Sequence, residues 1–140
     1  MTRPGVDGGT LVIEIVGGVD DKIYPNVPCD SDGMDVQTAL ERAWGLHADP
    51  HDKLHFEFVL SYYGDLGYFV QEIDHIVDTP ASYWSFYSDI NQTGQLEYMN
   101  IGIDTAMVTP GKTVRFAYEI YDGQRHAGTT LEVKRKRMLG

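Results

Sequence analysis

The sequence predicts a single α+β domain in which one helix lies across a sheet of several short strands. Segments with alternating apolar residues recur along the chain between glycine-containing turns, and only one segment has the spacing of an amphipathic helix. With 140 residues, 42% of them hydrophobic, the chain is long enough for one core. We therefore expect one domain over residues 1–133 and a basic C-terminal tail over residues 134–140.

The predicted helix covers residues 35–45. Asp35 stands where an N-cap carboxylate would accept free backbone amides, and Gly45 is a natural stop. We expect the helix to pack through Val36, Leu40 and Trp44. The apolar positions that define its buried stripe are Val36, Ala39, Leu40, Ala43 and Trp44.

Three segments have the alternation of half-buried strands. The predicted core faces are Leu11, Ile13 and Ile15 in the first, Leu54, Phe56, Phe58 and Leu60 in the second, and Val114, Phe116, Tyr118 and Ile120 in the third. Glycine-containing turns separate the segments, for example at 17–21, 64–67, 91–94 and 109–112. The pair Asp122-Gly123 predicts a hairpin or short loop back into the segment TTLEVK.

The stretch YWSFY at residues 83–87 is aromatic on both faces if it is a strand, because successive side chains point to opposite sides. We assign Trp84 and Phe86 to the core against the helix. Tyr83 and Tyr87 then lie on the open face, where more core, a partner or a ligand would cover them.

The charge distribution and the single cysteine narrow the classes of function. The net charge is −10, and Lys134–Arg137 hold four of the 11 basic residues, so the body of the chain should repel nucleic acid. The basic tail is solvated, touches an acidic partner or phosphate, or lies along its own acidic body. Cys29 cannot form an internal disulfide. No segment predicts a signal peptide or membrane span, so we expect a cytoplasmic protein unless a leader was removed.

Five segments together resemble a known family. In chain order they are GMDVQTALERA, GDLGYFVQEID, SYWSFYSD, NIGID and TPGKTVRFAYE, which span about residues 33–121. They are similar in order and spacing to the transcobalamin C-terminal-like domain. The positions that carry the resemblance are Gly67, Tyr68, Val70, Ile73, Tyr83, Trp84, Gly102, Gly111, Val114 and Phe116.

The resemblance implies a β-grasp, ubiquitin-like fold with a mixed sheet of four to six strands packed on one helix. It also implies cobalamin as a ligand, since in transcobalamin and intrinsic factor this domain closes over cobalamin against a separate helical domain. The chain shows no such helical domain, and the residues themselves predict no cofactor. Asp74-His75 replaces the family's tight Asn-Gly turn, so we expect a longer or differently aimed loop there.

Two patterns are compatible with metal binding but are incomplete. Asp30, Asp32 and Glu41 occupy positions 1, 3 and 12 of a calcium loop, but the glycine required at position 6 is replaced by Asp35. His47, His51 and His55 recur every four residues, yet Pro50 argues against a continuous helix there. We predict no metal site from either pattern.

Enzyme signatures are missing from the sequence. It has no phosphate-binding glycine loop and no nucleophile elbow. Asp74 and His75 are adjacent, but adjacent strand residues face opposite ways and make a poor acid-base pair. Whether the chain is an enzyme stays open, with the balance towards no catalysis.

The tyrosines are the strongest functional signal. Tyr68, Tyr83, Tyr87 and Tyr98, with Tyr62 and Tyr63 nearby, exceed what so small a core needs, and their hydroxyls suit a surface that is apolar and wet at its rim. We predict a non-catalytic accessory or structural subunit that docks onto another protein, or onto its own copy, through these residues. The alternatives are a domain that binds cobalamin or another bulky small ligand, and an enzyme of unrecognised type.

Overall fold

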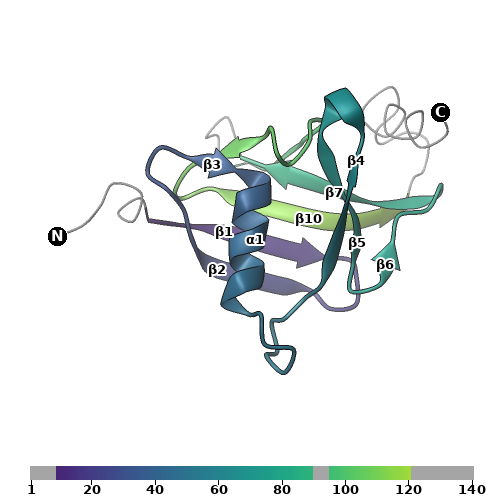
Figure 1. Cartoon of the computed structure of the whole chain (residues 1–140), viewed down its shortest axis with the longest axis horizontal. Coiled ribbons are helices and arrows are strands. Elements are labelled where there is room, and N and C mark those ends of the chain that lie inside the picture. The colour runs from purple at the N-terminus through teal and green to yellow at the C-terminus, as the bar shows by residue number, and fades with distance from the viewer. Residues whose placement is uncertain (1–8, 90–94, 121–140) are drawn as a thin grey trace.

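The computed structural model describes residues 9–89 and 95–120 (Figure 1). These residues form β1 (Thr10–Val16), β2 (Lys22–Pro28), β3 (Met34–Asp35), α1 (Val36–Leu46), β4 (Phe58–Tyr62), the 3-10 helix η1 (Gly64–Leu66), β5 (Tyr68–Ile73), β6 (Ile76–Val77), β7 (Ser82–Ser88), β8 (Glu97–Tyr98), β9 (Met107–Val108) and β10 (Thr113–Ile120). No helix among them is long and apolar enough to cross a membrane. The predicted turn at 91–94, the Asp122-Gly123 hairpin and the tail at 134–140 lie outside the described residues.

The main sheet has five strands in the order β2-β1-β10-β7-β8. β1 and β10 are parallel, and each of the other neighbouring pairs is antiparallel. Two smaller sheets complete the fold, one formed by β3 and β9 and one ordered β4-β5-β6. The predicted α+β class with one helix across a sheet is therefore confirmed.

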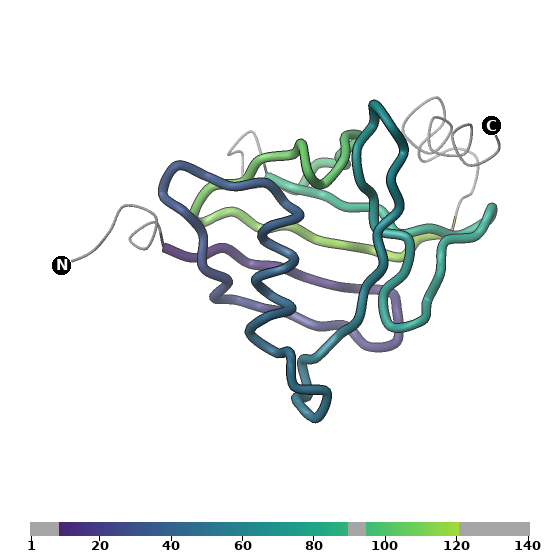
Figure 2. Tube along the Cα trace, viewed as in Figure 1, coloured from purple at the N-terminus to yellow at the C-terminus, as the bar shows by residue number. Residues whose placement is uncertain are grey.

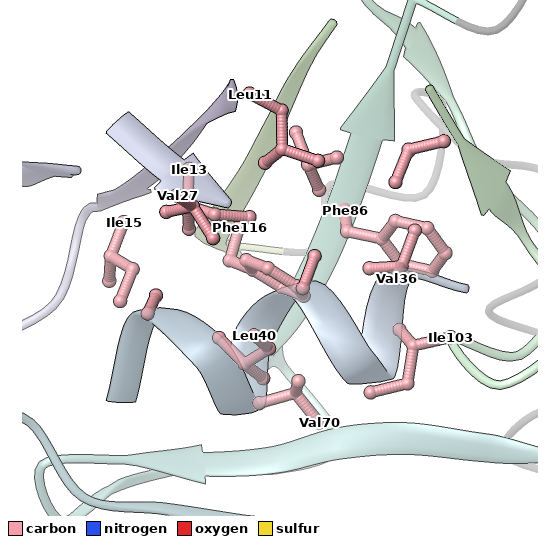
Figure 3. Close-up of a cluster of buried hydrophobic side chains, with 14 of the residues drawn as sticks. Leu11, Ile13, Ile15, Val27, Val36, Leu40, Val70, Phe86, Ile103 and Phe116 are labelled. Carbon is pink, nitrogen blue, oxygen red and sulfur yellow. The ribbon is translucent and has the colours of Figure 1, made fainter. Parts of the chain in front are cut away.

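The helix and the three-stranded sheet both lie over the same face of the main sheet (Figure 1). Leu11, Ile13 and Ile15 of β1 point into this interface, as predicted, and each is at most 2% exposed. Figure 3 shows them on one side of the core, with Leu40 of α1 and Val70 of β5 on the other side. The main sheet is therefore half-buried, with one face in the core and one face turned away from it.

The helix begins as predicted, and its buried stripe is narrower than predicted. Asp35 is the N-cap, and its carboxylate accepts a hydrogen bond from the Thr38 amide at 2.7 Å. The predicted core position of Trp44 is wrong, because its side chain is 36% exposed. At 3.6 residues per turn Trp44 lies about 80° around the helix from Val36, at the margin of the stripe. The helix also passes Gly45 and ends at Leu46.

The second predicted strand begins later than its alternation suggested, and the buried face of the third ends before Ile120. Phe56 is fully buried but lies before the start of β4. The residues ahead of it form a turn, in which the Asp52 carboxylate accepts a hydrogen bond from the Leu54 amide at 2.8 Å. Leu54 packs against the core from this turn. Ile120, at the end of β10, is 72% exposed rather than buried.

The turn between β5 and β6 is tight, which corrects the expected longer loop. Ile73 pairs with Ile76, so only Asp74 and His75 connect the strands, and both adopt positive φ, at 51° and 70°. Non-glycine residues rarely adopt this conformation, although Asp and His do so more readily than most. The Asp74 side chain supports the turn by accepting hydrogen bonds from the Glu57 amide at 2.9 Å and from Lys22 Nζ at 3.3 Å.

Candidate functional site

The face of the main sheet opposite α1, called here the open face, carries most of the candidate residues. Strand alternation places Trp84, Phe86, Val114 and Phe116 in the core and their neighbours on the other side. Along β1 the alternation assigns Glu14 and Val16 to the open face. The strands β7, β8 and β10 contribute Tyr83, Ser85, Tyr87, Tyr98, Arg115, Ala117 and Glu119.

Strand register brings Tyr87 between Arg115 and Tyr98. Tyr87 pairs with Arg115 of β10 on one side and with Tyr98 of β8 on the other. The rings of Tyr87 and Tyr98 meet edge to face, with centroids 5.7 Å apart and planes at 68°. This is one of the favoured geometries for an aromatic pair. Two of the four predicted tyrosines therefore form one aromatic unit at this edge of the open face.

The Tyr87 hydroxyl is anchored to a carboxylate further along β10. It donates to Glu119, whose two carboxylate oxygens lie at 2.7 and 2.9 Å. Glu119 is four residues beyond Arg115, the register partner of Tyr87, so the tyrosine side chain leans along the strands. Between them lie Ser85 and Ala117, which are register partners and are both buried. Small residues here leave room for the leaning ring.

Arg115 is held at the other end of this row. Its Nε donates to Glu14 Oε1 at 2.7 Å, and the two residues are register partners on the parallel strands β10 and β1. The pair is partly exposed, so its main effect is to fix the direction of the guanidinium rather than to stabilise the fold.

A hollow of about 360 Å³ lies on the open face among these side chains. Its size is at the lower end of pockets that hold small molecules. The described residues of its lining combine apolar side chains with the guanidinium of Arg115, the carboxylate of Glu119 and the phenol of Tyr87. The residues that line it are Val16, Tyr87, Leu96, Arg115, Ala117 and Glu119. This mixture suits recognition of an amphipathic group.

The sequence predicted that the Tyr83 side chain is exposed on the open face, and this prediction is wrong. Its side chain is 3% exposed, and burial raises the pKa of its phenol, with the neighbouring Tyr98 as the next cause. Together with Phe69 and Tyr98 it borders a cavity of about 10 Å³, close to the size of one water molecule. Strand alternation along β7 puts Tyr83 on the open side, yet its side chain is buried there. It contributes to packing rather than to an exposed contact.

Tyr68 belongs to a different aromatic cluster. It pairs in register with Tyr62 at the far end of the β4-β5 hairpin, and their ring centroids are 4.9 Å apart. The Tyr68 amide donates to Asp104 Oδ1 at 2.9 Å, which fixes the hairpin to the loop before β9. Tyr62 is 63% exposed and Tyr68 36%. The structure therefore divides the four predicted tyrosines between two places.

The incomplete metal patterns are occupied by internal contacts. Asp30 binds Arg42 at 3.1 Å, and Glu41 accepts a hydrogen bond from Gln37 at 3.2 Å, so these carboxylates face different partners. The histidine segment forms the small loop after α1, at the lower end of the tube in Figure 2. Within residues 9–89 and 95–120, no three His, Cys, Asp or Glu side chains are arranged to hold a metal ion.

The histidines of this loop are paired with carboxylates. His47 Nδ1 lies 2.9 Å from Asp52 Oδ2, and His55 Nε2 lies 2.5 Å from Glu57 Oε2. His55 Nδ1 also lies 2.8 Å from the His47 carbonyl oxygen. That carbonyl, followed by Glu57, raises the pKa of His55. The Leu54 amide, followed by His47, lowers the pKa of Asp52.

Two further candidates are not arranged for catalysis. Cys29 is buried, and burial raises the pKa of its thiol, which disfavours the reactive thiolate. Asp74 is engaged by Lys22 and the Glu57 amide, whereas the adjacent His75 points to solvent and is 91% exposed.

The sequence did not predict five of the residues at this site, which are Glu14, Val16, Leu96, Arg115 and Glu119. A signal for two of them was present: alternation in VRFAYEIY puts Arg115 and Glu119 on the side opposite Val114 and Phe116. The partners of Arg115 and Tyr87 depend on strand order, which alternation alone does not give.

Comparisons with known proteins bear on the fold alone. The chain matches no protein-family model and no curated protein. It is similar to the crystal structure of a "putative metal binding protein" from Ruminococcus gnavus ATCC 29149, with a TM-score of 0.53 and 13% sequence identity. The match covers 79% of this chain and 96% of that one. At this identity, what the two proteins share is a fold.

Proposed function

We propose that the chain is a non-catalytic binding module that docks onto a partner protein through the open face, with Tyr87 and Tyr98 as its aromatic anchors. The observation that carries the proposal is the hollow beside this tyrosine pair, where apolar walls meet Arg115 and Glu119. Aromatic residues and arginine are enriched at the energetic centres of protein interfaces.

The edges of the main sheet favour docking by the face over docking by strand addition. β2 is the outer strand on one side and contains Pro25 and Pro28, which have no amide to donate. On the other side, the outer strand β8 pairs with β7 only at Tyr87 and Ser88. Beyond this pairing, the Trp84 amide of β7 donates to Asp78 Oδ1 at 2.7 Å. A carboxylate that binds an edge amide blocks a further strand at that point.

We also propose that the fold is a β-grasp of the transcobalamin C-terminal-like type. Support comes from the order of the main sheet, in which a β1-β2 hairpin precedes the helix and the late strand β10 lies in the centre, parallel to β1. The resemblance in sequence described above points the same way. This relationship suggests a binding role but does not identify the ligand.

Cobalamin or another bulky small ligand is the second candidate. The hollow favours it because it has the polar and apolar lining of a ligand site. Its volume is at the lower end for drug-sized molecules, and a corrin ring with its nucleotide loop is much larger. The hollow alone could therefore hold only part of such a ligand, and a second surface would have to cover the rest.

The test is affinity purification from the native source with three forms of the chain. The site variant carries Tyr87→Ser and Tyr98→Ser, and the matched control carries Tyr62→Ser and Tyr68→Ser in the other aromatic cluster. A partner retained by the wild type and the control but lost by the site variant supports the proposal. Its affinity is then measured with purified components.

Retention of the same partner by both double variants would contradict the proposed face. A parallel titration with cobalamin, followed by its absorbance, tests the second candidate. Tight binding to the isolated chain, lost in the site variant, would replace the partner-docking proposal.

A further inference from the structure

One row of side chains crosses the whole open face, from one outer strand of the main sheet to the other. Strand register sets its order as Ile23 on β2, Glu14 on β1, Arg115 on β10, Tyr87 on β7 and Tyr98 on β8. The middle of the row is therefore an ion pair, with an apolar side chain on one side of it and an aromatic pair on the other.

The ion pair in this row has capacity for a second partner. Its hydrogen bond from Arg115 Nε to Glu14 Oε1 uses one of the five guanidinium N–H donors and one of the two carboxylate oxygens. Both side chains are partly exposed. A group that approaches the open face can therefore form further charge-assisted hydrogen bonds with this pair.

Ile23 gives the row an exposed apolar end. Its side chain is 56% exposed, whereas its chain neighbours Lys22 and Tyr24 are buried on the other side of β2. Among the described elements, α1 and the β4-β5-β6 sheet lie over the core face and do not cover it (Figure 1). An occupant of the open face that presents an apolar or aromatic side chain here would remove this surface from water, which stabilises the contact.

The same row on a second copy of the chain has the complementary order of groups. When two open faces pack about a two-fold axis that runs along the strands between β1 and β10, Glu14 of each copy lies opposite Arg115 of the other. Ile23 of each copy then lies opposite Tyr87 of the other. Two sheets related in this way have nearly aligned strands, as in most sheet-on-sheet packings.

The ion pair also selects this axis over the alternative one. A two-fold axis across the strands would place Glu14 opposite Glu14 and Arg115 opposite Arg115, and like charges in contact across an interface are unfavourable. Residues 9–89 and 95–120 hold 18 of the 21 acidic residues but five of the 11 basic residues. Many other contacts between copies would therefore bring carboxylates together, whereas the crossed pairs bring each carboxylate to a guanidinium.

We infer that the partner of the open face is a second copy of this chain, and that two copies form a two-fold dimer with crossed pairs of Glu14 and Arg115. The inference rests on the proposed function, because it names the partner for the same face. The main sheet is roughly 20 Å wide, since its five strands lie about 4.8 Å apart. Such a face is at the small end for stable interfaces, so the dimer should dissociate on dilution.

Dimerisation is measured by sedimentation equilibrium of the full-length chain, over a dilution series from micromolar to millimolar concentration. The wild type should pass from monomer to dimer within this range. Glu14→Arg and Arg115→Glu should each weaken the dimer by about tenfold or more, because each change places like charges opposite each other at two positions. Melting temperatures establish that both variants are folded.

An equal mixture of these two variants is the decisive sample. In a mixed dimer each substituted group lies opposite a group of opposite charge on the other copy, so the mixture should dimerise nearly as well as the wild type. Both variants remain net negative, because each change alters the net charge of −10 by two units. Attraction between oppositely charged molecules therefore does not explain the recovery.

The surface ion pair of Asp30 and Arg42, at 3.1 Å, provides the matched control. Asp30→Arg and Arg42→Glu make the same changes of charge away from the open face, and each should dimerise like the wild type. If a charge reversal in the row unfolds the chain, Glu14→Gln and Arg115→Gln repeat the test without introducing like charges. Each neutral variant should weaken the dimer severalfold.

Three results would overturn the inference. They are a wild type that stays monomeric at millimolar concentration, a dimer that none of the four variants at Glu14 and Arg115 weakens, and folded charge-reversal variants that do not associate when mixed. Equal weakening by the control variants would also contradict it, because overall charge would then set the dimer affinity.

The variant with Tyr87→Ser and Tyr98→Ser separates this inference from the proposed function. A monomeric wild type that retains a different partner protein, which the tyrosine variant loses, removes the second copy and leaves the proposed function intact. A dimer that responds to the charge variants as expected but not to the tyrosine changes supports the crossed pairs and contradicts the tyrosine anchors of the proposed function.

Discussion

Leu40 lies where the helix, the main sheet and β5 meet, and its side chain is fully buried (Figure 3). Replacing it with Ala should lower the free energy of unfolding by about 2–5 kcal/mol, because the change removes apolar contacts and leaves a cavity. Chemical denaturation measures the loss. Trp44→Ala, at the margin of the buried stripe of the same helix, should lower the free energy of unfolding clearly less. An equal loss for the two variants would contradict the assignment of Trp44 to the margin of the stripe.

His55 has hydrogen-bond acceptors at both ring nitrogens, the His47 carbonyl and the Glu57 carboxylate. A neutral imidazole has one N–H and cannot donate to both, so this environment favours the charged form. Asp74, on the β5-β6 turn, adds to the same effect, and the pKa of His55 is raised. The histidine therefore ties the end of α1 to the segment before β4 while it is protonated.

This raised pKa gives the stability of the fold a predictable dependence on pH. The contribution of His55 is fully present below the unfolded pKa of about 6.5 and is lost as the pH rises through the raised folded value. Denaturation curves across this interval should show the loss in the wild type and not in His55→Gln. His51→Gln, at a side chain 88% exposed, should behave like the wild type. A wild-type pH dependence in His55→Gln would show that other groups cause it.

At the scale of elements, the turn between β5 and β6 is held by one side chain. Asp74 joins three segments, since it accepts from Lys22 at the start of β2 and from the Glu57 amide before β4. Asp74→Asn keeps a residue that tolerates positive φ but removes the charge opposite the buried Lys22. The expected loss of stability is about 1–3 kcal/mol.

A double-mutant cycle with Lys22→Met separates the ion pair from the turn. In the Lys22→Met background, Asp74→Asn should lower the free energy of unfolding by less, because there is no longer a buried ammonium group that loses its carboxylate partner. Equal costs in both backgrounds would mean that the turn, and not the pair with Lys22, requires the aspartate.

The extent to which the sequence predicted these elements depends on how local each signal is. The helix start at Asp35 and the buried faces of β1 and β7 follow from spacing within a few residues, and they were predicted. The sequence did not predict that Leu54 lies in a turn instead of a strand, because the Asp52 turn competes with strand alternation. The burial of Tyr83 and the separation of Tyr68 from Tyr87 depend on how sheets meet. Alternation predicts on which side of a strand a residue lies, but it does not predict which strands lie next to that strand.

At the scale of the whole molecule, no metal is expected to contribute to stability. A metal that binds only the folded state raises the melting temperature in proportion to the logarithm of its concentration over its Kd. Addition of Ca²⁺ or Zn²⁺ should therefore leave the melting temperature unchanged, as followed by scanning calorimetry. A shift of several degrees that a chelator reverses would establish a site that the residue patterns did not predict.

The whole molecule is organised as a main sheet with one face in the core and one face proposed for binding. Pro25 and Pro28 lie on the outer strand β2, and the Asp78 carboxylate binds the Trp84 amide in the part of β7 that β8 does not pair with. These features discourage strand pairing along the edges, so the open face is the surface on which specific recognition is expected.

The most direct test of this account compares two tyrosines, Tyr83 and Tyr87, that strand alternation places on the same side of β7. Tyr87→Ser, combined with Tyr98→Ser, should change the melting temperature little but weaken partner binding by roughly 30-fold or more for each true anchor, which corresponds to about 2 kcal/mol. Tyr83→Ser should instead destabilise the fold, because the side chain is buried. Thermal melts and binding isotherms are recorded for both variants. Unfolding of the Tyr87 and Tyr98 variant, or unchanged partner affinity in a folded one, would contradict the claim that the open face is the binding surface.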